Sequence, residues 1–233
     1  MKKEVIIITG TSRGIGYQLA DHYLNKGYIV AGCSRNLSSI SHENYYHQAL
    51  DVTEERAIAK FVKEVYKEYG AIDVLINNAG IASMNHFLLT PLSSIENIYK
   101  VNVFAPFVFI REVAKIMSLA KKGRIINMSS IASPLNLEGE AAYASSKAAL
   151  ESLTKVASKE LADIGITVNA IGPTPFDTAL VRTVPKETIL KLINKQTIKR
   201  KTEFIDIANV VDFFINTNSS FITGQIIYLG GVN

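Results

Sequence analysis

The sequence TGTSRGIG at residues 9–16 directly follows the apolar run at residues 5–9 and directly precedes a segment with helical periodicity, residues 15–26. Glycines permit a tight turn here and let the backbone approach a ligand closely. The free N–H groups and the positive dipole at the start of a helix hold phosphate groups. A glycine pattern alone indicates only a turn, but this strand-to-helix context predicts a dinucleotide-binding loop. The residues predicted to form it are Gly10, Thr11, Ser12, Arg13, Gly14, Ile15 and Gly16.

Short β-branched runs alternate with helical segments along the rest of the chain. Near-continuous apolarity in such runs is typical of strands that are covered on both faces. The predicted strands are residues 5–9, 29–33, 45–50, 73–76, 123–129, 166–171 and 225–229. The predicted helices are residues 15–26, 53–69, 102–120 and 141–164. This order predicts one α/β domain over residues 1–233, a Rossmann-type doubly wound parallel sheet.

One crossover is unusually short. Only residues 36–44 separate the second predicted strand from the third. Parallel strands normally need about a dozen connecting residues that include a helix. We therefore expect a stunted or missing helix at this point, close to where the adenosine end of a dinucleotide would lie.

Composition and charge limit the classes of partner. The 233 residues include 25 Lys and Arg against 21 Asp and Glu, a net charge of +4 without one long basic tract, so no nucleic-acid partner is expected. Cys33 is the only cysteine, which excludes an intrachain disulfide and predicts a reducing, cytoplasmic location. No apolar run approaches the ~18 residues of a membrane span. We expect no membrane association and no metal site.

The end of the second predicted strand bears on the choice of cofactor. A site that prefers NAD places an acid there, about 20 residues past the glycines, to accept a hydrogen bond from the ribose. This chain instead has Ser34 and Arg35, with no acid between Tyr28 and Ser41. Arg35 and Arg13 are suited to charge-assisted bonds with the 2′-phosphate of NADP. The sequence favours NADP(H) over NAD(H).

Tyr143 and Lys147 lie four residues apart, on one face of a predicted helix. A free tyrosine has a pKa of about 10, and a neighbouring ammonium favours its phenolate. Such a phenol is able to exchange a proton with a substrate oxygen. The spacing is common on surface helices, so the pair has meaning only together with other motifs.

Those motifs make the chain resemble the short-chain dehydrogenase/reductase family from Thr9 to Gly231. The family's loop reads Thr-Gly-x-x-x-Gly-x-Gly, and Asn77-Asn78-Ala79-Gly80 resembles its Asn-Asn-Ala-Gly block. Ser130 precedes Tyr143 by 13 positions, the family's spacing for its catalytic serine; Ser129 is the alternative. Asn102 resembles the helix asparagine that holds a water beside the lysine, and an N-cap is its alternative role. The resemblance implies hydride transfer between a nicotinamide and a carbonyl or secondary alcohol, with the catalytic residues Asn102, Ser130, Tyr143 and Lys147.

The resemblance also implies further contacts to the cofactor. The residues that match the family's cofactor positions are Asp51, Val52, Asn78, Ala79, Gly80, Pro173, Thr174, Phe176 and Thr178, besides Tyr143 and Lys147. Thr174 departs from the family, which has a glycine at this position. A threonine followed by Pro175 does not easily take a positive φ, so we expect Thr174 to be extended.

Other implications concern substrate and assembly. Residues 179–203 resemble the family's variable substrate lid. Members that reduce acyl-carrier-protein thioesters often carry an arginine where this chain has Ile164, although Arg124 remains at a second such position. This departure disfavours a 3-oxoacyl carrier-protein reductase. A homotetramer or homodimer is expected through the two long helices, whose apolar residues exceed what one inner face needs: Phe104, Phe107, Val108, Val113, Leu150, Leu153 and Val156.

Two other functions compete with an oxidoreductase acting on a small carbonyl or alcohol. A non-catalytic regulatory protein would keep the dinucleotide site without turnover, since a fold does not determine a function. A sugar epimerase or dehydratase shares the Tyr-x-x-x-Lys pair, but such relatives have longer chains and a differently spaced loop. The intact Asn-Ser-Tyr-Lys set favours the oxidoreductase.

Overall fold

Seven parallel strands form the centre of the fold in the computed structural model, which describes residues 3–176 and 186–232. Their order across the sheet is β3-β2-β1-β4-β5-β6-β7. Their bounds are β1 Val5–Thr9, β2 Ile29–Ser34, β3 Tyr45–Ala49, β4 Val74–Asn77, β5 Gly123–Met128, β6 Ile166–Gly172 and β7 Ile226–Tyr228. The strand order reverses between β1 and β4, where open α/β sheets bind their ligands. The predicted doubly wound parallel sheet is confirmed.

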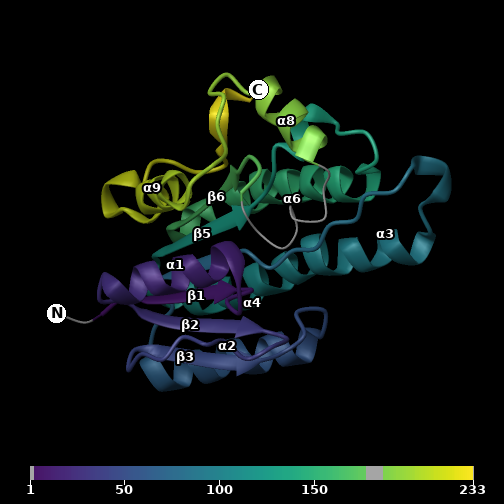
Figure 1. The fold of residues 1–233 in the computed structure, drawn as a ribbon. Coiled ribbons are helices and arrows are strands. Elements are labelled where there is room, and N and C mark those ends of the chain that lie inside the picture. The colour runs from purple at the N-terminus through teal and green to yellow at the C-terminus, as the bar shows by residue number, and fades with distance from the viewer. Residues whose placement is uncertain (1–2, 177–185, 233) are drawn as a thin grey trace.

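Helices cover both faces of the sheet (Figure 1). On one face lie α1 (Gly14–Asn25) and α9 (Phe204–Ile215), which pack on Ile6 and Ile8 of β1. On the other face α2 (Glu55–Tyr69), α4 (Ala105–Ala120) and α6 (Ala141–Glu160) pack around Val5 and Ile7. The alternation along β1 follows from the twofold side-chain period of a strand. The smaller elements are η1 Phe87–Leu89, α3 Leu92–Tyr99, η2 Lys100–Phe104, α5 Ala132–Leu135, η3 Ala162–Ile164, α8 Lys186–Lys195, η4 Thr217–Ser219 and η5 Leu229–Gly231.

One predicted helix begins earlier than expected and contains a π-helical turn. The predicted helix 102–120 begins earlier, as α3 followed by the π-helical turn η2 and then α4. Pro106 lies in the first turn of α4 and lacks an N–H, while the amide of Ala105 reaches back five residues to the carbonyl of Lys100. Asn102 therefore lies inside a helical stretch, and its alternative interpretation as an N-cap is wrong.

Among the helices of the described residues, none has the length and apolarity needed to cross a membrane.

The crossover between β2 and β3 contains no helix, as expected from its length. It is held instead against the glycine loop. The hydroxyl of Ser38 donates to the carbonyl of Thr11 at 3.2 Å, and the hydroxyl of Tyr45 donates to Oγ1 of Thr11 at 2.9 Å. Residues 35–38 therefore stay beside the carboxyl end of β1.

Candidate active site

The glycine loop joins the carboxyl end of β1 to α1 in a tight turn. Gly10 and Gly14 have φ of 78° and 65°, a region that residues with a Cβ rarely adopt. A Cβ on Gly16 would collide with the carbonyl of Gly10 and with the side-chain amide of Asn78. The first turn of α1 has neither an acidic residue nor a side-chain cap. Its amides and dipole are therefore arranged to accept an anion.

Asn78 fastens this loop to the end of β4. Its side-chain amide donates to the carbonyl of Thr9 at 2.8 Å. In return, the hydroxyl of Thr9 accepts from the backbone N–H groups of Asn78 and Ala79 at 3.0 and 2.9 Å. Neighbouring Asn77 donates to Oδ1 of Asn127 on β5 at 2.8 Å. The Asn-Asn-Ala-Gly block thus connects three strand ends.

Thr11 and Ser34 are engaged within the protein. The amide of Thr11 donates to the carbonyl of Cys33, and its carbonyl and hydroxyl accept from Ser38 and Tyr45. Ser34 is buried, donates to the carbonyl of Asn36 at 2.8 Å and lies 2.9 Å from Nε2 of His47. Both residues therefore hold neighbouring segments of the protein in place. The links to Tyr45 and His47 join side chains from different strands, so no local pattern indicated them.

Arg13 follows β1 and Arg35 follows β2, and both have exposed side chains. They lie on two sides of the corner formed by the carboxyl ends of these strands, which we call the cofactor corner. Asp51 is also exposed, and its Oδ1 accepts from the amide and hydroxyl of Thr53 at 2.9 Å each. Val52 beside it is buried, with 8% of its surface exposed. The segments that follow β1 and β2 therefore offer two cations to a ligand.

Lys147 lies beneath Tyr143 on α6. Its Nζ is 5.7 Å from the centroid of the Tyr143 ring and donates to the carbonyl of Met128 at 2.7 Å. Burial lowers the pKa of Lys147 to about 8, against the opposing effect of Glu151. Burial raises the pKa of Tyr143 to about 12, while the Ser130 hydroxyl lowers it and Glu140 raises it. Without a ligand, the pair is a neutral phenol above a mostly charged ammonium at pH 7.

Asn102 is fully buried on the other side of Lys147. Its Oδ1 accepts from the amide of Ile81, and its Nδ2 donates to the carbonyl of Ile81, both at 2.9 Å. Nδ2 also donates to Oγ of Ser146 at 3.0 Å. A Cβ on Gly80 would lie 3.4 Å from Oδ1 of Asn102 and 3.5 Å from Nζ of Lys147. Gly80, which follows β4, therefore lies beside both side chains.

Ser129 and Ser130 have different surroundings. Ser129 is buried, and its hydroxyl donates to Oε1 of Glu151 at 2.5 Å. Ser130 is partly exposed, accepts from the amide of Ala132 at 3.1 Å and interacts with the hydroxyl of Tyr143. The geometry therefore favours Ser130 over Ser129 as the serine beside the tyrosine.

Glu151 is a site residue that the sequence reasoning missed. It lies one helical turn beyond Lys147, with 8% of its surface exposed, and it also accepts from the hydroxyl of Ser133 at 2.8 Å. Its carboxylate, together with burial, raises the pKa of Tyr228 on β7 to about 12. An acid on the inner face of a helix rich in small residues was the available signal. This carboxylate holds together the segments that follow β5 and the end of β7.

The loop after β6 is anchored from several sides. The carbonyl of Pro173 accepts from the amide of Ile131 at 3.3 Å. Thr174 is buried, its Oγ1 lies 2.5 Å from Oγ1 of Thr202, and it does not take a positive φ, as expected. Phe176 packs against the apolar cluster under α1 and α9. Thr178, also predicted to contact the cofactor, lies outside the described residues, as do residues 179–185 of the expected lid.

These features fit a nicotinamide dinucleotide. The uncapped first turn of α1 and the close approach at Gly16 provide a cradle for a pyrophosphate that a larger side chain would fill. Tyr143, Lys147 and Ser130 lie at the carboxyl ends of the adjacent strands, where the nicotinamide would reach. Within residues 3–176 and 186–232, no three His, Cys, Asp or Glu side chains gather as a metal-binding group.

Comparisons with known proteins agree with this geometry. The sequence profile of the family described as short chain dehydrogenase matches residues 4–188. A 3-oxoacyl-[acyl-carrier-protein] reductase, FabG, of Staphylococcus epidermidis is 31% identical over 97% of this chain and 96% of its own length. The structure of ElxO with NADP bound has 29% identity and a TM-score of 0.89, covering 98% of this chain and 97% of that chain. NAD⁺-bound xylitol dehydrogenase has 26% identity and a TM-score of 0.86, covering 98% of both chains.

The family match covers more than half of the chain, and the fold is that of its relatives. The chain belongs to the short-chain dehydrogenase/reductase family of oxidoreductases.

Proposed function

We propose that this protein is an NADP(H)-dependent oxidoreductase that interconverts a carbonyl and a secondary alcohol on a small molecule. The observation that carries the proposal is the cluster of Asn102, Ser130, Tyr143 and Lys147 beside the glycine loop. These residues come from η2, the end of β5 and α6, and parallel pairing brings them to one edge of the sheet. This arrangement argues against a regulatory protein without turnover, because such a role requires none of the four.

Proton transfer is assigned to Tyr143. A bound nicotinamide supplies the hydride in reduction and accepts it in oxidation. Ser130 donates a hydrogen bond to the substrate oxygen and holds it beside the phenol. Tyr143 gives its proton to that oxygen as negative charge develops on it, and takes a proton from the alcohol in the reverse direction.

Lys147 assists by its charge and by its position. Its ammonium has three N–H donors, of which one bonds the carbonyl of Met128. The positive charge favours the phenolate form of Tyr143 during proton transfer. Glu151 opposes the loss of that charge, since its carboxylate raises the pKa that burial lowers. Asn102 fixes the backbone of Ile81, adjacent to Gly80, and thereby positions the segment facing Lys147.

The preference for NADP(H) is part of the proposal. Arg13 and Arg35 are exposed at the corner where the 2′-phosphate would lie, and no acid replaces them at the end of β2. Related structures contain either NAD⁺ or NADP, so the family alone does not decide. Two exposed guanidinium groups attract a phosphate dianion through bidentate, charge-assisted bonds.

The substrate side is built from α8 and the segment after it. Ile189 and Gln196 of the predicted lid, residues 179–203, are buried, and the amides of Thr197 and Ile198 donate to the carbonyl of Gly230 at 2.9 and 3.0 Å. These anchors support a lid whose base is fixed to the end of β7.

The cytoplasmic location stays a prediction from the single cysteine, which is buried.

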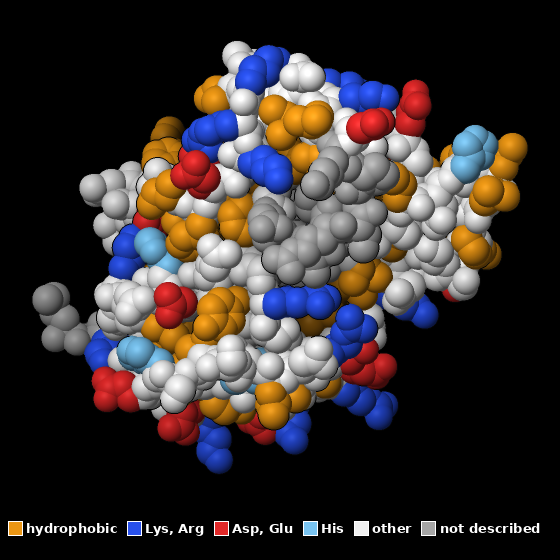
Figure 2. Space-filling model, in the orientation of Figure 1, with side chains coloured by type: hydrophobic (Ala, Val, Ile, Leu, Met, Phe, Trp, Pro, Cys, Tyr) orange, Lys and Arg blue, Asp and Glu red, His pale blue; other side chains and the backbone are white. Residues whose placement is uncertain are grey.

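We also propose self-association through α4 and α6. Phe104, Phe107 and Val156 expose 57%, 50% and 49% of their surfaces, whereas Val113 and Leu150 are buried in the core. A second apolar group lies on η1 and the start of α3, where Phe87, Leu88 and Leu92 are exposed. Figure 2 shows hydrophobic side chains gathered at this projecting end. Burial of these faces against a second copy removes apolar surface from water.

The first prediction concerns the phenol. Tyr143→Phe should lower kcat by about 10²–10⁴-fold, the usual contribution of a general acid, while NADPH affinity stays within a few-fold. The measurement uses wild type and variant with NADPH and a panel of ketones, hydroxysteroids, sugars and acyl thioesters. Tyr66→Phe on α2 is the matched control and should leave kcat unchanged. Near-normal turnover by Tyr143→Phe would contradict the assignment, and binding of NADPH without turnover of any substrate would favour the regulatory alternative.

The second prediction concerns the charge of Lys147. Burial lowers its pKa from 10.5 in the unfolded chain to about 8 in the folded protein. Between these values only the unfolded chain binds the proton, so the free energy of unfolding rises with pH across that window. Lys147→Met removes this titration. The unfolding free energy of wild type relative to the variant should rise by about 1.5 kcal/mol from pH 8 to pH 9.5, measured by chemical denaturation. A difference that stays constant with pH would show that Lys147 is not desolvated.

The third prediction concerns the 2′-phosphate. Arg35→Ala should raise KM for NADPH about tenfold and change KM for NADH little, because one charge-assisted bond at an exposed, screened site is lost. Arg56→Ala, which removes an exposed arginine from α2, is the control for the lost charge. The comparison is kcat/KM for both cofactors in the three proteins. A wild-type preference for NADH, or unchanged NADPH kinetics in Arg35→Ala, would overturn the choice of NADP(H).

The fourth prediction concerns assembly. Wild type should sediment as a dimer or tetramer at micromolar concentration, and Phe107→Glu should shift it toward the monomer by placing a charge in the apolar face of α4. Leu37→Glu, at a still more exposed apolar position in the crossover, should leave the assembly intact. A monomeric wild type would rule out the proposed interface.

A further inference from the structure

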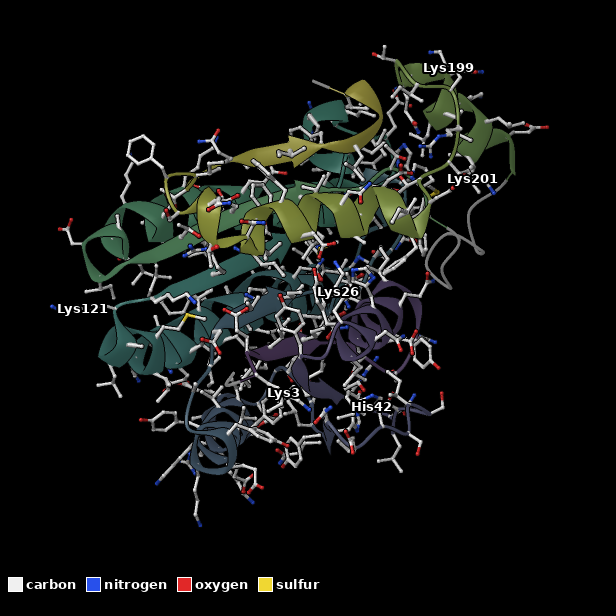
Figure 3. All side chains as sticks on the ribbon, turned by 90° about the vertical axis from the view of Figure 1, so that its left-hand side faces the viewer. Lys3, Lys26, His42, Lys121, Lys199 and Lys201 are labelled. Atoms are coloured by element: carbon white, nitrogen blue, oxygen red, sulfur yellow. The ribbon has the colours of Figure 1, made fainter. Side chains whose placement is uncertain are left out.

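Apart from the candidate active site, a cavity lined mainly by polar residues lies at the amino end of the sheet, away from the predicted catalytic residues. It has a volume of about 360 Å³ and opens between the starts of β5 and β6 and the loop after α9. Lys121, at its mouth, lies in Figure 3 at the opposite end of the molecule from Lys199 and Lys201, which follow α8. Arg124 in its wall precedes Ser130 by six residues, which separates the two sites by about 20 Å along β5.

Two buried polar atoms in this wall have no hydrogen-bond partner in the described part of the chain. They are Nε of Arg124 and Oγ1 of Thr167, whose residues expose 5% and 6% of their surfaces. The two residues are register partners on β5 and β6, and their neighbours Ile125 and Val168 pack on the opposite face of the sheet. Their side chains therefore lie side by side. Leaving such atoms unpaired is costly, and native proteins pair nearly all of them.

The lining is also positively charged. It contains Lys121, Lys122 and Arg124 and no Asp or Glu. Lys122 is paired with Glu4 at 3.1 Å, whereas within residues 3–176 and 186–232 no carboxylate lies within 4.0 Å of the Arg124 guanidinium. Its NH1 donates only to the carbonyl of Gly123, at 3.0 Å. Burial lowers the pKa of Arg124, and Glu4 offsets this effect in part. A buried guanidinium with so little compensation requires an anion.

We propose that this cavity binds a phosphate-sized oxyanion, either inorganic phosphate or the phosphate group of a small monoester. Arg124 and Thr167 line the cavity and carry the two buried unpaired atoms, and Lys121 and Ser220 are exposed residues of the same lining. Because only 5% of Arg124 is exposed, its guanidinium is reached by a small ligand that enters the cavity and not by the surface of a docking protein. The volume leaves room for an organic group beside the phosphate.

Calorimetric titration of the cofactor-free protein tests this site, with inorganic phosphate and glycerol phosphate as probes and chloride to keep ionic strength constant. Wild type should bind phosphate saturably, and the Arg124→Met variant separates this binding from any phosphate held by the glycine loop and Arg35. Arg124→Met should weaken binding at least tenfold, because a charge-assisted bond is lost, and Thr167→Val about threefold. Methionine in place of a buried, poorly paired arginine keeps the fold, and valine matches the shape of threonine, so one of the two variants remains informative if the other is unstable.

Two controls locate the binding. Lys63→Met removes one exposed positive charge from α2 and should leave phosphate affinity unchanged. Arg35→Ala should keep the phosphate binding that Arg124→Met loses, since the cofactor corner is a different site. A fivefold tighter constant for glycerol phosphate identifies a monoester as the ligand, and equal constants identify inorganic phosphate. The proposal is overturned if neither probe binds, if Arg124→Met binds unchanged, or if affinity is lost in Arg35→Ala instead.

Discussion

The hydroxyl of Thr9 accepts hydrogen bonds from two successive backbone amides, those of Asn78 and Ala79, and the geometry of the site depends on this junction. It fastens the carboxyl end of β1 to the carboxyl end of β4 at the point where the strand order reverses. The Asn78 side chain returns a bond to the Thr9 carbonyl, and Gly16 packs against Asn78 and the carbonyl of Gly10. On the other side of the same block, Gly80 faces Asn102 and Lys147. The cradle for the phosphates and the predicted proton-transfer groups are thus parts of one continuous set of contacts.

The interior of this site is polar to a degree that is costly for a protein core. Lys147, Asn102 and Glu151 expose 4%, 0% and 8% of their surfaces. Each is matched with specific donors or acceptors: a backbone carbonyl for the ammonium, a backbone amide pair for the asparagine and two serine hydroxyls for the carboxylate. Buried polar groups with specific hydrogen-bond partners make one arrangement of the surrounding segments much more favourable than others. Here those segments are the ends of β4 and β5 and the inner face of α6.

Local patterns predicted most of the fold. The β-branched runs located each strand to within one residue at either end. The glycine loop, the Asn-Asn-Ala-Gly block and the Tyr-x-x-x-Lys pair selected side chains that the structure brings to the carboxyl ends of the strands. The missing helix after Asn36 followed from chain length alone. Local patterns did not predict the π-helical turn at Asn102, because it combines the missing N–H of Pro106 with the packing of Asn102 on Ile81.

The Glu151 network also escaped prediction, because it joins residues 129, 133, 151 and 228, which no spacing rule connects. Likewise, the sequence did not predict the tertiary bonds of Thr11 to Tyr45 and of Ser34 to His47; contact of Thr11 and Ser34 with the cofactor stays a prediction.

The helix-free crossover between β2 and β3 has a consequence for the order of folding. Only ten residues, 35–44, separate these strands, whereas each of the other pairs in the sheet is joined through at least one helix. The entropy lost on closing a loop grows with its length, and contacts between residues close in sequence form fastest. Pairing of β2 with β3, which the loop of Ser38 connects, therefore loses the least conformational entropy of any strand pairing in the sheet. Substitutions in this strand pair should act on the folding rate, whereas substitutions at the late-pairing β7 should act on the unfolding rate.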